Sequence, residues 1–102
     1  QAFNAMQTRV VEVDGQFAGY VQVNAGEVDD YLSMLILAPA YRSLGVGAQL
    51  LSTIQADSRI KERGLYLRVF RTNHSARRFY ERAGWDVVAD EGDFLMMRPA
   101  DA

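Results

Sequence analysis

Cysteine is absent from the 102 residues of the chain, and histidine occurs only once, as His74. Without cysteine the chain forms no disulfide, offers no thiolate to a metal ion and has no thiol to carry an acyl group as a covalent intermediate. His74 stands at the start of a predicted helix, and no cluster of other ligand residues surrounds it. We therefore expect no metal site, and we interpret His74 as an exposed surface residue.

Long apolar runs are missing as well. No segment approaches the roughly 20 apolar residues that cross a bilayer, and no signal peptide is visible. The formal net charge is only −2. A small negative charge disfavours nucleic acid as a partner. The sequence thus predicts a soluble cytoplasmic protein with neither a membrane nor a nucleic-acid partner.

Arginine is locally abundant in spite of this low net charge. Five arginines with aromatic residues among them lie in one stretch, a pattern that nucleic-acid surfaces share. They are Arg68, Arg71, Arg77, Arg78 and Arg82. Because they are distributed over a predicted strand, a loop and several helix faces, they form no single stripe. A nucleic-acid surface stays open as an alternative interpretation.

The hydrophobic pattern predicts one α/β domain over residues 1–102, a length that suits a single core. The predicted order is β-β-β-α-β-α-β-β, with strands at 8–13, 19–23, 29–37, 65–70, 85–90 and 93–98 and helices at 45–63 and 74–83. Asp14-Gly15 and Glu91-Gly92 predict hairpin turns, and Gly64 and Gly84 predict helix ends. Each helix crosses over between two strands, so we expect a mixed sheet with a parallel pair at its centre.

The segment APAYRSLGVGAQLL, residues 38–51, places an arginine and two glycines between a strand and a helix. The first amides of a helix lack partners and lie at the positive end of its dipole, and glycines let an anion approach them. Arg42 adds a planar cation suited to phosphate oxygens. We interpret the loop as a cradle for a diphosphate; an ordinary tight turn with a surface arginine is the alternative. It is not a P-loop, which needs Lys-Ser/Thr where Ala48-Gln49 stands, nor a dinucleotide fingerprint, which needs a glycine at Leu50.

Two motifs make the chain resemble the GNAT superfamily of acyl-CoA N-acyltransferases. The family's pyrophosphate loop, Arg/Gln-x-x-Gly-x-Gly/Ala after Leu-x-Val-x-Pro, is similar to LILAP and YRSLGVG at 35–47. Its second motif, Asn-x-x-Ala-x-x-x-Tyr-x-x-x-Gly-Phe, is similar to NHSARRFYERAGW at 73–85, with Trp85 in place of phenylalanine. The resemblance covers Gln7 to Arg98. It implies the GNAT fold, in which acetyl-CoA enters a splay between the two parallel strands, and acetyl transfer to a primary amine.

The resemblance also implies which residues bind coenzyme A. The backbone of one strand would pair with the pantetheine arm and hold the thioester carbonyl, at Leu35, Ile36 and Leu37. The loop would bind the diphosphate, through Arg42, Ser43, Leu44, Gly45, Val46 and Gly47. The second motif would contact the pantetheine through Asn73, Ala76 and Tyr80. A helix N-cap is the alternative role for Asn73, and buried packing is the alternative for the leucines.

Two residues are predicted to be catalytic. In the family, the tyrosine at the position of Tyr80 protonates the departing thiolate, whereas a purely structural core ring is the alternative. Asp29 is the candidate base, since relatives often place a carboxylate at the entrance to this strand. Strand alternation puts Asp29 on one face with Tyr31, Ser33, Leu35 and Leu37. A solvated turn pair formed with Asp30 is the alternative for Asp29.

The family usually begins with a strand and two helices that have no counterpart here before the strand at 8–13. The half that binds the cofactor is therefore expected to be complete, and the half that binds the acceptor is not. The enzyme interpretation, with direct transfer in a ternary complex, thus has an alternative in a non-catalytic CoA-binding sensor or partner module. An exposed Val-rich edge predicts a homodimer. The acceptor would be a small-molecule or peptide amine that the sequence does not identify.

Overall fold

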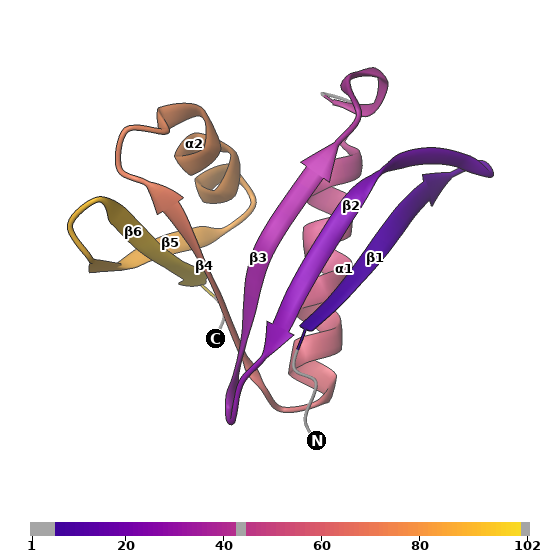
Figure 1. Ribbon diagram of the computed structural model, residues 1–102. Helices are drawn as coiled ribbons and strands as arrows, with labels where there is room; N and C mark the ends of the chain where they lie inside the picture. The colour runs from indigo at the N-terminus through magenta and orange to yellow at the C-terminus, as the bar shows by residue number, and fades with distance from the viewer. Residues whose placement is uncertain (1–5, 43–44, 101–102) are drawn as a thin grey trace.

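The computed structural model of the chain describes residues 6–42 and 45–100, and Figure 1 shows its course. Six strands and two α-helices follow one another in the predicted order, with a short 3₁₀ turn, η1, at Pro39–Tyr41. The strands are β1 (Met6–Val13), β2 (Gln16–Ala25), β3 (Asp29–Leu37), β4 (Gly64–Phe70), β5 (Trp85–Asp90) and β6 (Phe94–Pro99). The helices are α1 (Val46–Ile60) and α2 (His74–Arg82).

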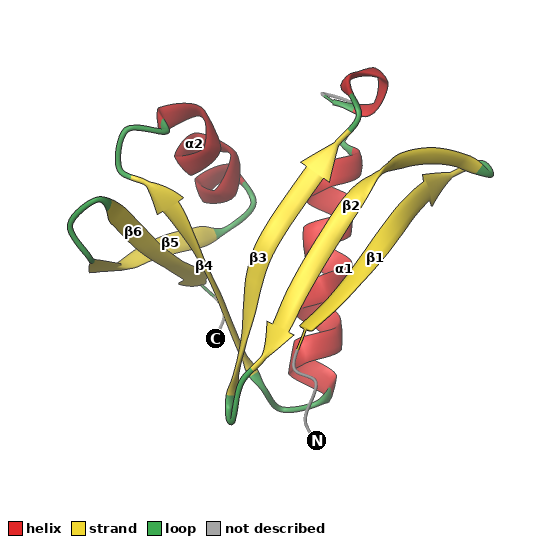
Figure 2. Cartoon of the chain, viewed as in Figure 1, coloured by secondary structure: helices red, strands yellow, loops and turns green. Residues whose placement is uncertain are grey.

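The six strands form one mixed sheet in the order β1-β2-β3-β4-β6-β5. Only β3 and β4 are parallel neighbours, so the predicted α/β fold with a central parallel pair is confirmed. This parallel pairing joins residues 29–31 to residues 64–66 and then stops, although β3 continues to Leu37 and β4 to Phe70. Above these three pairs the two strands diverge into the V that Figure 2 shows. We call the paired end of this splay the vertex.

A β-bulge interrupts β3 just above the vertex. Leu32 pairs with Val23 and Met34 pairs with the neighbouring Gln22, so Ser33 is an additional residue without a counterpart in β2. The hydroxyl of Ser33 donates to the Gln22 carbonyl oxygen at 3.3 Å and accepts from the Gln22 side-chain amide at 3.0 Å. These bonds hold the bulged residue against β2.

The bulge changes which side chains of β3 face the helix α1, because it displaces their alternation by one residue. Below it, Asp30 accepts a hydrogen bond from Ser58 of α1. Above it, Leu35 packs against the core, whereas Ile36 is exposed. Strict alternation from Asp29 predicted that Leu35 and Leu37 share its face, and this prediction is wrong, because one inserted residue exchanges the two faces of the strand.

The end of α1 also differs from the prediction, which ran the helix to Arg63 with Gly64 as the residue that follows it. The helix ends at Ile60, and Glu62 takes the left-handed conformation, with φ at 57°. Gly64 instead begins β4, where a Cβ atom would lie only 2.0 Å from an Asp29 carboxylate oxygen. This close approach, and not a left-handed backbone, favours glycine at position 64, because a Cβ atom would displace the Asp29 carboxylate. Gly84 does follow α2 with φ at 93°, as predicted.

Both helices cover the same face of the sheet. Leu51 of α1 is buried among residues from β2 to β6, and α2 packs its apolar face on the same cluster. The buried apolar residues of the described core are Ala18, Val21, Leu32, Leu51, Leu65, Leu67, Val69, Trp85, Leu95 and Met97. Within the described residues, no helix combines the length and apolar character needed to cross a membrane.

Candidate functional site

The N-terminus of α1 lies just beyond the end of β3, and its first amides have no partner within the helix. Gly45 is the N-cap residue, with φ at 79°, and no described side chain caps the helix. The first turn contains no acidic residue, and a Cβ atom built on Gly45 would meet nothing within 4 Å among the described residues. A helix start with these properties can receive an anion, because its first amides point outward at the positive end of the dipole.

Arg42 lies exposed beside this helix start. Its Nε donates a hydrogen bond to the Leu37 carbonyl oxygen at 3.1 Å, which ties the side chain to the end of β3. That bond uses one of the five N–H donors of the guanidinium group. The remaining donors suit a phosphate group that approaches the helix start. Ser43 and Leu44, which were predicted in the same cradle, lie outside the described residues.

The second glycine of the loop has a packing role that its motif did not indicate. Gly47 is buried, and a Cβ atom on it would lie 3.0 Å from the ring of Phe79 and 3.4 Å from Leu37. Gly47 therefore permits the close contact between α1 and α2. Its amide still belongs to the first turn of α1, next to Val46, so packing does not exclude anion binding there.

The backbone of β3 lacks a β4 partner above the vertex. Residues 32–37 pair with β2 on one side, whereas their other side faces the splay. The backbone at Leu35, Ile36 and Leu37 is thus available to an extended, amide-containing chain, as in strand addition. Leu35 packs into the core at the same time, so side-chain packing and backbone binding are compatible.

Asn73 has the role of the helix N-cap, the alternative that its position suggested. Its side-chain oxygen accepts a hydrogen bond from the Ala76 amide at 3.1 Å. The amide NH₂ of Asn73 takes no part in this cap, and the residue is exposed. Contacts of Asn73 and Ala76 with a cofactor stay a prediction.

Tyr80 lies on the buried side of α2 in an aromatic cluster. Its ring makes an edge contact with Phe79, at 5.1 Å between centroids, and a tilted contact with Trp85 at 6.0 Å. Burial raises the pKa of Tyr80 above its ordinary value of 10.0. The phenol is therefore protonated at neutral pH and can act as a proton donor. The indole N–H of Trp85 beside it is buried and has no acceptor among the described residues.

Asp29 is held in an ion pair at the vertex. Both of its carboxylate oxygens accept from Arg98 of β6, at 3.0 Å and 3.3 Å. The hydrogen bond from Arg98 holds the pKa of Asp29 below its usual value. A carboxylate in this state is a weak proton acceptor, so the geometry does not support the predicted base. Arg98 was not predicted as a site residue, and its only indication in the sequence is a charged residue within an otherwise apolar strand.

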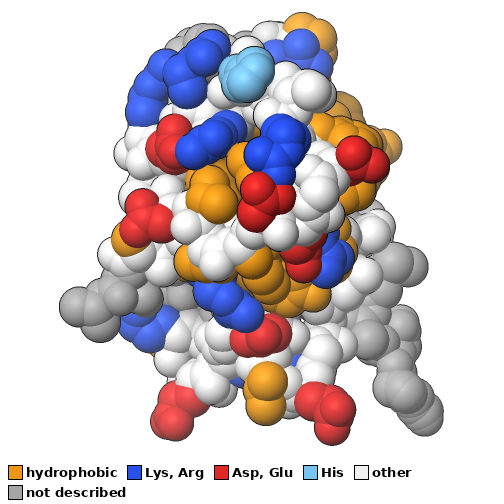
Figure 3. Space-filling view, turned by 90° about the vertical axis from the view of Figure 1, so that its left-hand side faces the viewer, with side chains coloured by type: hydrophobic (Ala, Val, Ile, Leu, Met, Phe, Trp, Pro, Cys, Tyr) orange, Lys and Arg blue, Asp and Glu red, His pale blue; other side chains and the backbone are white. Residues whose placement is uncertain are grey.

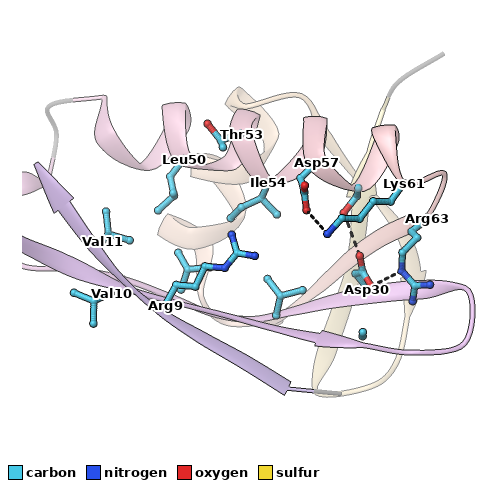
Figure 4. Close-up of a pocket in the computed structure, with 14 residues that line it drawn as sticks. Arg9, Val10, Val11, Asp30, Leu50, Thr53, Ile54, Asp57, Lys61 and Arg63 are labelled. Carbon is cyan, nitrogen blue, oxygen red and sulfur yellow. Dashed lines mark hydrogen bonds and ion pairs between the residues drawn. The ribbon is translucent and has the colours of Figure 1, made fainter. Parts of the chain in front are cut away.

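A separate groove lies between α1 and the strands β1 and β2, as Figure 4 shows. Its volume is about 540 Å³. Val11, Val23, Leu50 and Ile54 form apolar walls, and an ion pair of 3.1 Å between Asp57 and Lys61 lies at one end. None of the predicted cofactor residues that the structure describes lines this groove. The groove is therefore distinct from the splay.

Among the described residues, the charged side chains form no further cluster of the kind that binds a metal ion or an extended polyanion. Residues 6–42 and 45–100 contain no group of three or more His, Asp or Glu side chains that could hold a metal ion. On the side of the molecule that Figure 3 shows, Lys and Arg are interspersed with Asp and Glu. Several arginines of the chain are paired with acids, such as Arg68 with Glu91 at 2.8 Å and Arg71 with Asp90.

The chain matches known proteins over most of its length. The profile described as "Acetyltransferase (GNAT) domain" matches residues 5–87. A relative named 5-NmdU N-acetyltransferase, from Pseudomonas phage PaMx11, is 30% identical over 91 residues. This match covers 87% of this chain and 64% of the phage protein.

Solved structures show the same fold. PaiA N-acetyltransferase of Thermoplasma acidophilum, in complex with coenzyme A, has a TM-score of 0.82 at 22% identity, over 93% of this chain and 60% of that one. Naa50 of Arabidopsis thaliana, in complex with the bisubstrate analogue CoA-Ac-MVNAL, has a TM-score of 0.73 at 18% identity, over 88% and 69%. The chain thus spans less than two thirds of the phage relative and of the Thermoplasma protein.

Proposed function

Because the chain belongs to the GNAT acetyltransferase family, we propose that it transfers an acetyl group from acetyl-CoA to a primary amine by direct attack in a ternary complex. The splay between β3 and β4 carries this proposal. It leaves the backbone of β3 above the vertex without a β4 partner, close to the start of α1, which no described side chain caps. Tyr80 of α2 lies on the helix-covered side of the sheet. These three features fit the amide-containing arm, the diphosphate and the thioester of acetyl-CoA.

The diphosphate would bind at the start of α1. The amides of Val46 and Gly47 would donate to its oxygens, and Arg42 would add a cation from the end of β3. The pantetheine arm would extend along the open edge of β3, and a backbone N–H near Leu37 would polarise the thioester carbonyl. Asn73, through its uncommitted NH₂, would bond an amide of the arm on the other side of the splay.

Transfer would then need one bond to form and one to break. The nitrogen of the neutral amine attacks the thioester carbon, the new C–N bond forms, and the C–S bond breaks as the tetrahedral intermediate collapses. The amine gives up one proton, and the leaving thiolate takes one from the phenol of Tyr80. The phenolate that is left takes a proton back from water, because burial raises the pKa of Tyr80 and so favours the protonated phenol.

The proton that leaves the amine needs an acceptor, and we propose water for this role. Asp29, the predicted base, is engaged by Arg98 and has a lowered pKa. An α-amine, with a pKa of about 7.7–8.0, already supplies much neutral nucleophile near pH 8. Amines of this kind are therefore expected to be better acceptors than lysine-like amines, whose pKa is about 10.4.

The acceptor is proposed to be a small-molecule or peptide amine. The phage relative is named for N-acetylation of 5-NmdU, and the Arabidopsis protein was crystallised with an analogue that joins CoA to MVNAL. We propose no nucleic-acid or membrane partner, because positive and negative side chains are mixed on the face in Figure 3. A cytoplasmic location stays a prediction from the sequence.

The proposed function is tested by binding and turnover together. Acetyl-CoA should raise the melting temperature of the protein, and CoA release should depend on one member of a panel of nucleoside, polyamine and peptide amines. Binding without turnover for any amine would favour the non-catalytic CoA-binding module. Absence of both binding and turnover would refute the proposal, and would favour the alternative of an arginine-rich nucleic-acid module.

We further propose that the protein is a homodimer through the edge strand β1. Val10 is 57% exposed on this strand, and the apolar groove of about 540 Å³ opens beside it. A two-fold axis at Val10 would place Val10 opposite its own copy and Arg9 opposite Val11, and so would separate the two arginines. Sedimentation equilibrium of Val10→Lys against the unchanged chain tests this. A monomer in both cases would contradict it.

A further inference from the structure

The vertex of the splay has an unusually short backbone connection. Three residue pairs, at 29–31 and 64–66, are all that join β1–β3 to β4–β6 by strand pairing. A three-pair parallel ladder is weak by itself, because parallel pairing is slightly less stable than antiparallel pairing. The angle at which the two half-sheets diverge must therefore be stabilised by side chains.

One side-chain bridge crosses the vertex on the face without helices. The Asp29 carboxylate reaches from β3 over β4 to Arg98 of β6 and is held by two hydrogen bonds, at 3.0 Å and 3.3 Å. Its path is open only because position 64 is glycine, where a Cβ atom would lie 2.0 Å from Asp29 and 3.2 Å from Arg98. The Arg98 guanidinium also lies 5.4 Å from the ring centroid of Tyr66. Asp29, Gly64 and Arg98 thus form one crossing that joins three strands.

A second bridge lies on the opposite, helix-covered face. Asp30 is only 8% exposed and pairs with Arg63, the residue before β4, at 2.7 Å. Arg63 also donates to the backbone oxygen of Gly26 in the β2–β3 turn and to that of Asp29 at the start of β3. Ser58 of α1 donates to the other Asp30 oxygen at 3.4 Å. Two adjacent aspartates therefore point to opposite faces of the sheet, and each binds an arginine that belongs to the other half.

A stack of rings lies at the last backbone pair of the vertex. Tyr31 and Tyr66 are parallel within 13°, with 4.9 Å between their centroids. The guanidinium of Arg68 lies 5.5 Å from one ring and 5.7 Å from the other. The stack adds side-chain contact across the point where the backbone ladder ends, just below the bulge at Ser33. Divergence of the strands is thus confined to the part of β3 above the vertex.

We propose that Asp29 and Arg98 are positioning residues that clamp the vertex and set the width of the splay, with Asp30 and Arg63 as the fixed counterpart on the other face. Binding of acetyl-CoA in the clamped splay rests on the function proposed above, whereas the clamp itself does not depend on that function. Loss of the bridge between Asp29 and Arg98 leaves the three backbone pairs and the bridge between Asp30 and Arg63. The half-sheets therefore stay joined, but the angle between them is less well defined. The affinity for a ligand that binds along the edge of β3 is therefore lowered.

The chain offers a matched control for this proposal. Asp90 also binds an arginine, Arg71, and a hydrogen bond from that arginine lowers its pKa as well. This pair joins the end of β5 to the residue after β4, so both partners lie in the same half-sheet. Asp29→Asn and Asp90→Asn are the same isosteric change, and only the first removes a bridge across the vertex.

Two measurements on these variants test the clamp. The first is hydrogen exchange of the amides at 29–31 and 64–66 without any ligand, which reports local opening. We expect exchange to be about three- to tenfold faster in Asp29→Asn and Arg98→Met, the scale of one partly exposed, bidentate ion pair. Arg98→Lys should lie nearer to the unchanged chain, and Asp90→Asn should match it. The second measurement is calorimetry with coenzyme A, where Kd should rise by about the same factor in the same two variants.

The outcomes separate the clamp from other roles of Asp29. The clamp is refuted if Asp29→Asn opens the vertex no more than Asp90→Asn does. It is also refuted if Asp29→Asn moves only the pH dependence of turnover, which is the result expected of a general base. If the unchanged chain does not bind coenzyme A, the proposed function fails, and the exchange measurement still decides for or against the clamp.

Discussion

The two half-sheets of the molecule pack very differently. Strands β1–β3 have eight to ten residues each, and the groove of about 540 Å³ stays open between two of them and α1. Strands β4–β6 have six or seven residues, and with α2 they enclose Trp85, Leu67 and Met97, each at most 2% exposed. The first half therefore keeps backbone groups and a helix start accessible, whereas the second forms a dense aromatic core.

This difference suggests how binding and chemistry are divided. The first half contains the accessible backbone, Arg42 and the start of α1, which no described side chain caps, and all suit the binding of an extended anionic molecule. The proposed proton donor, Tyr80, belongs to the second half, where burial raises its pKa. We expect substitutions in the first half to change affinity, and substitutions near Tyr80 to change stability or turnover.

The largest expected effect is on the core of the second half. Trp85→Ala should lower the free energy of unfolding by about 3–5 kcal/mol, since removal of a fully buried aromatic side chain leaves a cavity. Leu50→Ala should cost only about 1 kcal/mol, because Leu50 is half-buried and already borders the open groove. Urea denaturation measures both values. Similar losses at the two positions would show that the halves are packed equally well, and Trp85→Phe provides a folded variant if Trp85→Ala does not fold.

The next effect concerns the chemical step. Tyr80→Phe keeps the ring in contact with Phe79 and Trp85, so stability should fall by no more than about 1 kcal/mol. Turnover should fall about 10²–10⁴-fold, the scale for loss of a general acid. The decrease should shrink with an acyl donor whose thiol leaves readily without a proton. Wild-type turnover at saturation, with chemistry shown to be rate-limiting, would assign protonation of the thiolate to water.

A smaller effect is expected at the start of α1. Arg42→Ala should weaken coenzyme A binding about ten- to a hundredfold, since it removes a hydrogen bond to a charged group worth about 1.5–3 kcal/mol. Lys61→Ala removes the same charge from the other end of the helix, where Lys61 pairs with Asp57, and is the control. Calorimetry with coenzyme A compares them. Equal affinity in both variants would contradict the diphosphate cradle. Gly45 is unsuitable for this test because its φ of 79° would strain any side chain.

The smallest effect is a dependence of stability on acid. The pKa of Asp29 is lowered in the folded state, first by the hydrogen bond from Arg98, so the folded state holds fewer protons there than the unfolded state. Its contribution is therefore present above the ordinary pKa of 3.8 and is lost as pH falls through the lower, folded value. Between about pH 6 and pH 3, the urea midpoint should fall less in Asp29→Asn than in the unchanged chain. An identical fall of the urea midpoint in both proteins would show that Asp29 does not contribute to the dependence of stability on pH.

Local patterns were sufficient to predict the elements and their order. The Asp14-Gly15 turn, with φ at 52° and 79°, and the Gly84 helix end follow from backbone preferences that neighbouring residues impose. Parallel pairing of β3 and β4 follows from the crossover helix between them. These features depend on short-range chemistry, which a sequence shows directly.

The features that were missed depend on contacts between distant residues. At Ser33, β3 has one residue more than the paired segment of β2, and no residue type in either strand predicts this bulge. The ion pair of Asp29 with Arg98 was not predicted, because the two residues lie 69 positions apart in the sequence. Gly64 was predicted to end the helix because it follows Lys-Glu-Arg, whereas its close approach to the Asp29 carboxylate joins residues far apart in the sequence.

The position of β4 in the sheet has a consequence for how the chain refolds. Three pairings, β1 with β2, β2 with β3 and β5 with β6, are hairpins between consecutive strands, and such local structures form early. β4 pairs instead with β3 and β6, and in each case a helix intervenes in the sequence. Until β4 inserts, β3 and β6 both present an unpaired edge to other chains. Refolding yield should therefore depend strongly on protein concentration, because a second molecule competes with β4 for the same two edges.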